Sequence, residues 1–134
     1  MIVVDTNVIS YRWMRSPYSE AADKTWATDP DWIVPLLWRS EFRNVLAGAL
    51  RRKLIALDTA IEIVEKAEMQ FAGREFPVSS RAVMRLVVNS RCSAYDCEFI
   101  ALARDQSVPL LTVDRQLLRD FPKTAISMEK FTRR

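Results

Sequence analysis

The chain has 134 residues, 49% of them hydrophobic and 28% charged, which is the composition of one globular domain over residues 1–134 and excludes a disordered chain. The net charge of +3 is mildly basic and compatible with a polyanionic partner. The chain has no histidine, which excludes Ser-His-Asp triads, Cys-His pairs and histidine-based ribonuclease chemistry. Any catalysis therefore has to use carboxylates, lysine, hydroxyl groups or a metal ion.

The cysteines and the N-terminus restrict the cellular setting. Cys92 and Cys97 are too few to close a zinc site without histidine, so we expect two reduced thiols. The first residues do not form a signal peptide, because Asp5 interrupts the apolar run. No apolar run approaches the length that crosses a bilayer. These features predict a cytoplasmic protein without a membrane partner.

The first part of the chain predicts two strands and two helices. Residues 2–4 are aliphatic and lead directly into Asp5, as in a strand that is buried on both faces. A short helix is expected from Val8, and a second one from Ser16, the expected N-cap before Pro17, to about residue 28. Residues 32–37 predict another buried strand, which Pro35 would end or bulge.

The remaining elements continue the alternation of strands and helices. Apolar spacing predicts a helix over residues 38–53, which forms a hairpin with a helix that Asp58 caps and Gly73 ends. The next elements are a short strand at 75–78, a helix capped by Ser79 or Ser80, a helix from 93 to 105, a strand at 108–113 and a weak strand at 124–128. This order predicts an α/β fold with a mostly parallel sheet and helices on both faces.

Four acids follow these strands or begin the helices. Asp5 and Asp114 each end an aliphatic run, and parallel strands bring their carboxyl ends to one edge of the sheet. Each of them could equally cap the next helix. Asp96 completes a capping-box pattern with Ser93, which needs no chemistry, and Glu41 lies in the first turn of a helix, where acids are common.

Together the four acids predict a metal site. Carboxylates at close range repel one another, and a divalent cation removes the conflict. Oxygen ligands without histidine or cysteine suit Mg²⁺ or Mn²⁺. Such an ion can activate water and stabilise charge on a phosphodiester.

Four segments in this order resemble a PIN domain, and most closely the VapC-like toxins of toxin–antitoxin modules. The resemblance covers essentially the whole chain and is carried by residues 2–7, 40–46, 93–97 and 111–114. It implies a PIN-like three-layer α/β/α sandwich with a five-stranded sheet. It also implies an endoribonuclease that uses Mg²⁺ or Mn²⁺, leaves 3′-hydroxyl and 5′-phosphate ends, forms a homodimer and is inhibited by a cognate antitoxin.

The resemblance also assigns residues. It implies that Asp5, Glu41, Asp96 and Asp114 are the metal-binding and catalytic acids, supported by Thr6 or Asn7 and by Thr112. Either of two further acids could supplement or replace one of the four. We rank Asp120 above Glu98, because Glu98 lies two residues from Asp96 and would point to another face of the helix.

The first hypothesis is therefore a metal-dependent ribonuclease that cuts single-stranded or loop RNA. Basic residues could hold the RNA backbone, although a solvated surface is their default role: Arg12, Arg15, Arg43 and Arg115. A second hypothesis is a non-catalytic module that binds RNA or protein and uses the acids as helix caps. A third, a phosphoacceptor receiver, ranks low because Arg115 rather than lysine follows Asp114.

The aromatic residues leave an alternative open. Four tryptophans are numerous for this length, and core packing is their default role: Trp13, Trp26, Trp32 and Trp38. Some of them, with Tyr11 and Met14, could instead form a surface for a second copy or an antitoxin.

Overall fold

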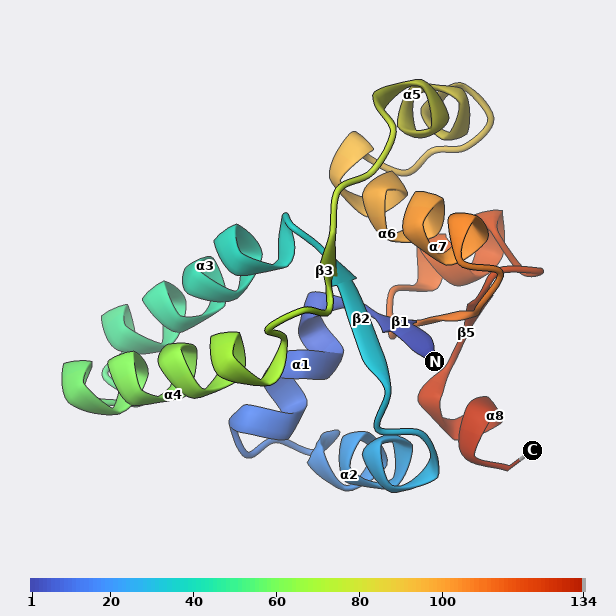
Figure 1. Cartoon of the computed structure of the whole chain (residues 1–134). Coiled ribbons are helices and arrows are strands. Elements are labelled where there is room, and N and C mark those ends of the chain that lie inside the picture. Colours follow the sequence, from blue (N-terminus) through green and yellow to red (C-terminus); the bar gives the residue numbers. More distant parts are fainter. Residues whose placement is uncertain (134) are drawn as a thin grey trace.

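A five-stranded parallel sheet forms the middle layer of the protein (Figure 1). The computed structural model describes residues 1–133. Every pair of neighbouring strands is parallel, and the spatial order is β3-β2-β1-β4-β5. The strands are β1 (Ile2–Val4), β2 (Trp32–Pro35), β3 (Glu75–Phe76), β4 (Leu110–Leu111) and β5 (Ala125–Ile126). The first strand of the chain therefore lies at the centre, as its uninterrupted aliphatic sequence predicts.

Helices cover both faces of this sheet, which confirms the predicted three-layer α/β/α architecture. One face is covered by α1 (Thr6–Trp13), α2 (Ser19–Thr28), α3 (Trp38–Arg51), α4 (Leu57–Gln70) and α8 (Met128–Thr132). The other face is covered by α5 (Ser80–Val88), α6 (Ala94–Asp105) and α7 (Arg115–Asp120). The helices α3 and α4 pack side by side as the predicted hairpin (Figure 1).

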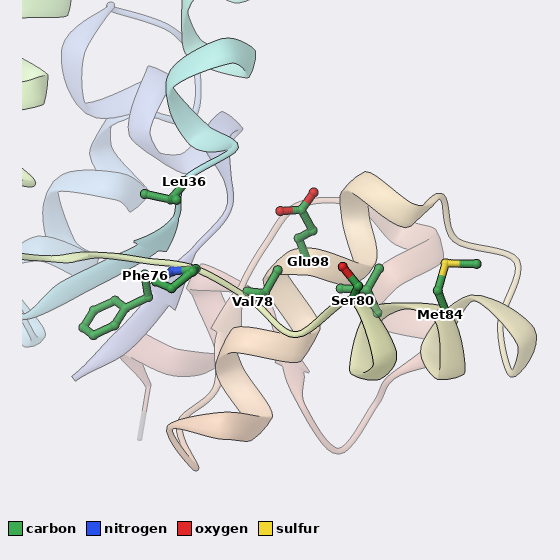
Figure 2. Close-up of a pocket in the computed structure, with 8 residues that line it drawn as sticks. Leu36, Phe76, Val78, Ser80, Met84 and Glu98 are labelled. Carbon is green, nitrogen blue, oxygen red and sulfur yellow. The ribbon is translucent and has the colours of Figure 1, made fainter.

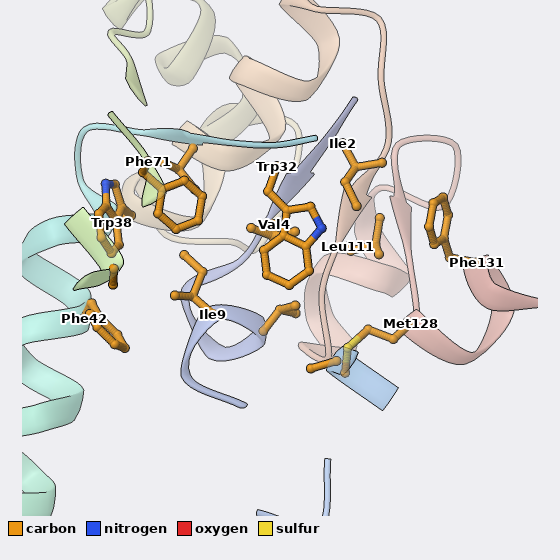
Figure 3. Packing of buried hydrophobic residues seen from close by; sticks show 14 of the residues in the cluster. Ile2, Val4, Ile9, Trp32, Trp38, Phe42, Phe71, Leu111, Met128 and Phe131 are labelled. Atoms are coloured by element: carbon orange, nitrogen blue, oxygen red, sulfur yellow. The ribbon is translucent and has the colours of Figure 1, made fainter. Parts of the chain in front are cut away.

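Two hydrophobic cores result, because successive residues of a strand point to opposite faces. Within β1, Ile2 and Val4 enter the first core, whereas Val3 enters the second. The first core is rich in aromatic side chains, among them the fully buried Trp32 and Trp38 (Figure 3). The second core contains the two cysteines, which are free thiols as predicted.

Several boundaries match the sequence-based expectations. Pro35 is the last residue of β2, and Ser79 rather than Ser80 caps α5 by accepting a hydrogen bond from the Ala82 amide. The helix expected at 93–105 is α6, with Ser93 as its N-cap. At the end of α4, Gly73 has a φ of 77°, which favours glycine.

Other expectations were wrong in detail. The helix α2 begins at Ser19 and not at Ser16, because the Ser16 hydroxyl accepts from the Tyr18 amide and forms a turn before the helix. Ala56, not Asp58, is the N-cap of α4. No bounds were predicted for the short helices α7 and α8, although Asp114 was recognised as a possible cap of a helix after β4, and β4 pairs over only two of the six residues expected. Within residues 1–133, no helix is both long and apolar enough to cross a membrane.

Candidate functional site

The site lies where the two central strands end. Asp5 directly follows β1, and its amide donates to the Leu111 carbonyl of β4 at 3.0 Å. Thr112 then follows β4, and its hydroxyl donates to Asp5 Oδ2 at 2.7 Å while accepting from the Asp114 amide at 3.0 Å. One buried hydroxyl group therefore connects the first and the last acid of the predicted site.

Asp5 is the most deeply placed of the acids, with 8% of its surface exposed. Its carboxylate caps α1 by accepting from the Thr6 amide at 2.8 Å. Burial raises the pKa of Asp5 above its ordinary value, and the charges of Asp96 and Asp114 add to the rise, whereas the hydrogen bonds from Thr112 and Thr6 oppose it. The carboxylate is thus held in place although its ionised form is disfavoured.

Glu41 approaches from the neighbouring helix. It lies in the first turn of α3, and its Oε1 accepts from the Thr6 hydroxyl at 2.8 Å. Burial raises the pKa of Glu41, and the charges of Asp5, Asp96 and Glu98 raise it further, while the bond from Thr6 lowers it. Thr6 therefore contacts two acids, Asp5 through its amide and Glu41 through its hydroxyl.

Asp96 and Asp114 complete the group from the opposite helical layer. Asp96 lies in the first turn of α6, where its amide donates to the Ser93 hydroxyl at 3.1 Å. Burial raises the pKa of Asp96, and the charge of Asp114 also raises it. Asp114 caps α7 through Oδ1, which accepts from the amides of Gln116 and Leu117. The same residue can therefore cap a helix and belong to the group of acids.

The four acids share one further property. In residues 1–133, none of them forms an ion pair with lysine, arginine or the N-terminus. Three of the arginines considered for RNA binding are instead paired with other acids, Arg12 and Arg15 with Asp23, and Arg43 with Glu68. The negative charge of the site is left without a basic partner in the described chain.

The supporting residues lie in different places. Thr6 and Thr112 contact the acids, whereas Asn7 is exposed and lines a cleft on the other side of α1. Asp120 accepts from the Arg91 amide at 2.9 Å and from the Cys92 thiol at 3.7 Å. Burial raises the pKa of that thiol to about 12, with the charge of Asp120 next in effect, so Cys92 is a protonated core residue.

Glu98 is closer to the site than its position on the helix suggested. Its charge raises the pKa of Glu41, while the charge of Asp120 does not contribute to the raised pKa values of Asp5, Glu41 or Asp96. Burial also raises the pKa of Glu98 itself. A sequence signal existed, since Glu98 is the one charged residue in the apolar run from 97 to 103.

The side chains of the site suit a hard divalent cation, because the atoms that could bind an ion are carboxylate and hydroxyl oxygens. Uncompensated charge and raised pKa values point the same way, since a cation stabilises the ionised carboxylates. Over residues 1–133, however, no group of three or more acidic or cysteine side chains is gathered closely enough to hold a metal ion. Ligation therefore requires side-chain movement toward the ion.

Comparisons with known proteins agree with this architecture. The PIN domain profile matches residues 2–123. PAE2754 from Pyrobaculum aerophilum superposes with a TM-score of 0.74 at 23% identity, over 98% of this chain and 85% of that one. FitAcB from Neisseria gonorrhoeae gives a TM-score of 0.74 at 21% identity, over 96% and 99% of the two chains.

A third structure, of FitAB bound to an IR36 DNA fragment, gives a TM-score of 0.69 at 21% identity, over 96% of this chain and 95% of that one. At these identities the structural likeness concerns the fold. The comparison with curated proteins found no match. The profile match extends over most of the sequence, including all four acids at the carboxyl edge of the sheet. The chain belongs to the PIN domain family.

Proposed function

We propose that this protein is a metal-dependent endoribonuclease that acts as the toxin of a toxin–antitoxin pair. PIN domains are generally nucleases. The observation that carries the proposal is the group of half-buried and buried acids around Asp5, whose pKa values are raised and which no basic side chain of residues 1–133 neutralises. A group of this kind is costly for folding and is typical of functional sites.

Asp5, Glu41, Asp96 and Asp114 would hold the cation, and the choice is Mg²⁺ or Mn²⁺ because all donors are oxygens. When bound, the ion would supply a water of lowered pKa and charge stabilisation for the phosphodiester. The chain itself orients the acids: Thr112 fixes Asp5, and Thr6 fixes Glu41. Hydrolysis of this type would leave 3′-hydroxyl and 5′-phosphate ends.

The test is cleavage of single-stranded RNA by the purified protein with Mg²⁺ or Mn²⁺. Asp5→Asn and Asp96→Asn should each lower the rate roughly 100-fold or more, because a bound ion contributes several kcal/mol and each 1.36 kcal/mol is tenfold. Glu65→Gln, an exposed acid on α4, is the matched control and should retain the wild-type rate. EDTA should abolish cleavage in every case.

A second readout is independent of activity. Mg²⁺ or Mn²⁺ should raise the unfolding temperature of the wild-type protein, since a ligand that binds only the folded state stabilises it by about 2.7 kcal/mol at 100 times its Kd. Asp5→Asn should remove this increase, and Glu65→Gln should keep it.

One observation favours the alternative of a non-catalytic binding module. Asp5 and Asp114 do cap α1 and α7, so both have a structural role without any ion. The same experiment separates the two functions, because asparagine retains a side-chain oxygen that can accept the capping bonds. Wild-type protein that neither cuts RNA nor gains stability with metal would favour the module.

The partners belong to the same proposal. We expect a homodimer that acts on RNA in the cytoplasm and is inhibited by an antitoxin. A cleft of about 610 Å³ between α1, α3 and α4 offers an apolar surface for such a partner. It is lined by Tyr11, Trp13 and Met14 among others. These are residues for which the sequence left an interface role open.

A further inference from the structure

A pocket of about 320 Å³ lies between the end of β2, the segment that leads from β3 into α5, and α6 (Figure 2). Its wall is formed by Leu36 after β2, by Phe76, Pro77, Val78 and Ser80 along the segment from β3 into α5, by Val83 and Met84 of α5, and by Glu98 of α6. This volume lies at the lower end of the range of about 300–1,000 Å³ that small ligands occupy. The pocket is thus large enough for one planar ring system.

Glu98 connects this pocket to the proposed active site. Its side chain lines the pocket, and it lies in α6 two residues after Asp96. In residues 1–133, the Glu98 side chain forms no hydrogen bond or ion pair, although it is half buried. A half-buried carboxylate without a donor is suited to accept hydrogen bonds from a ligand.

The remaining lining indicates what kind of ligand fits. Leu36 and Met84 are 54% and 57% exposed, which is high for large apolar side chains, and Val83 is buried beneath them. The described lining contains no lysine or arginine, so the pocket is unsuited to a phosphate group. Apolar walls with one carboxylate and the Ser80 hydroxyl suit an unstacked base, which RNA-binding proteins hold by its faces and read along its edge.

The carboxylate selects among the bases. It can only accept hydrogen bonds when ionised, so it favours an edge with adjacent N–H donors. Guanine presents two such donors, N1–H and the exocyclic N2–H. The other bases place a lone pair or a carbonyl oxygen next to their donor, which would repel the carboxylate.

We propose that this pocket receives an unpaired guanine of the RNA substrate and that Glu98 accepts hydrogen bonds from its N1–H and N2–H. Glu98 is then a specificity-determining residue, and the role rests on the proposed ribonuclease function. The pocket is lined by Glu98 of α6, the helix that carries Asp96, and by Leu36, which precedes the helix that carries Glu41, so the guanine would be close in the RNA sequence to the bond that is cut.

Binding to short RNAs tests the inference without cleavage. The Asp5→Asn protein is titrated, in Mg²⁺, with fluorescently labelled UUGUU and with UUIUU, in which inosine lacks the N2 amino group. The RNA with guanine should bind roughly tenfold more tightly than the RNA with inosine, because inosine cannot form one of the two hydrogen bonds to the charged carboxylate. Adding Glu98→Gln should abolish this preference, since the amide replaces an acceptor with a donor, whereas adding Glu65→Gln should preserve it.

Three results would overturn the inference. Equal binding of the two RNAs by the parent protein, or a guanine preference that survives Glu98→Gln, removes the role of Glu98. Met84→Arg places a charge in the wall of the pocket. If this variant differs from the wild type in molar mass by light scattering but keeps the guanine preference, the pocket is a contact between copies of the chain and not a guanine site. Failure of the ribonuclease proposal is recognised separately, as absent metal-dependent cleavage by the wild-type protein.

Discussion

At the scale of single residues, Thr112 combines two contacts of the site in one side chain. Its hydroxyl donates to Asp5 and accepts from the Asp114 amide, and the residue is fully buried. No other hydroxyl of the site joins two of the acidic segments across β1 and β4. The residue therefore affects both the stability of the fold and the ionisation of Asp5.

Thr112→Val should destabilise the protein by about 1–3 kcal/mol, because it leaves a buried acceptor on Asp5 and the half-buried Asp114 amide without partners. The bond from Thr112 lowers the pKa of Asp5, so its loss should raise that pKa and move the acidic limb of the cleavage rate to higher pH. Urea unfolding and a pH–rate profile measure the two effects. Thr112→Ser should restore both, and an unchanged acidic limb in the valine variant would contradict this role.

The same scale shows what could be predicted from sequence. Asp5 and Asp114 were found because an aliphatic run that ends in an acid indicates the end of a buried strand. Glu98 was undervalued because helix spacing separates it from Asp96, but its charge acts on Glu41, which belongs to another helix. Distances between helices depend on packing, which spacing along one helix does not describe.

At the scale of secondary-structure elements, the orientation of α3 depends on an anchor at its first turn. Glu75 of β3 accepts from the buried Trp38 indole at 2.7 Å and from Arg39 through two nitrogens, at 2.7 and 2.9 Å. Glu41 lies in the same first turn, where it accepts from Thr6 in the candidate site. The edge strand β3 therefore positions an acid that it does not touch.

Glu75→Ala should lower the free energy of unfolding by about 1–3 kcal/mol, since the buried indole N–H loses its acceptor. It should also slow RNA cleavage, because α3 carries Glu41. The matched control is Glu62→Ala, which breaks an exposed pair with Lys66 within α4 and should change neither quantity appreciably. Urea unfolding and cleavage rates of both variants measure the two effects. If Glu75→Ala were as stable as the wild-type protein, Glu75 would not anchor α3.

Element boundaries were predictable where a cap had a clear chemical signal. Ser79 and Ser93 accept from the helix amides as their sequences suggested. The helices α7 and α8 have six and five residues, too few for an apolar period to emerge. For α2, Ser16 had the right chemistry, but its hydroxyl bonds to Tyr18 in a turn before the helix.

At the scale of the whole molecule, the site opposes the stability of the fold. The pKa values of Asp5, Glu41 and Asp96 are raised in the folded state, so folding favours their protonated forms. Their contribution to stability is therefore greatest below the ordinary carboxyl range and is lost as pH rises through the raised values. Elsewhere, hydrogen bonds from arginine side chains lower the pKa values of Asp23 and Glu75. The stability that these two acids contribute is present above the ordinary carboxyl pKa and is lost as pH falls.

Asp96→Asn should show how much the ionised carboxylate of Asp96 destabilises the fold. In metal-free buffer the variant cannot ionise at this position, so its stability relative to wild type should increase between pH 4 and pH 7. Urea unfolding of both proteins at several pH values measures the difference. A difference that is independent of pH would mean that Asp96 ionises as easily in the fold as in the unfolded chain.

The position of β1 at the centre of the sheet has a consequence for synthesis on the ribosome. Its neighbour on one side, β4, is synthesised much later, and the bond between Thr112 and Asp5 spans 107 residues. At about 5–20 residues per second, translation separates Asp5 from Asp114 by roughly 5–20 s. A nascent chain therefore carries an incomplete set of acids until Asp114 has been synthesised, so the proposed site cannot assemble during that interval.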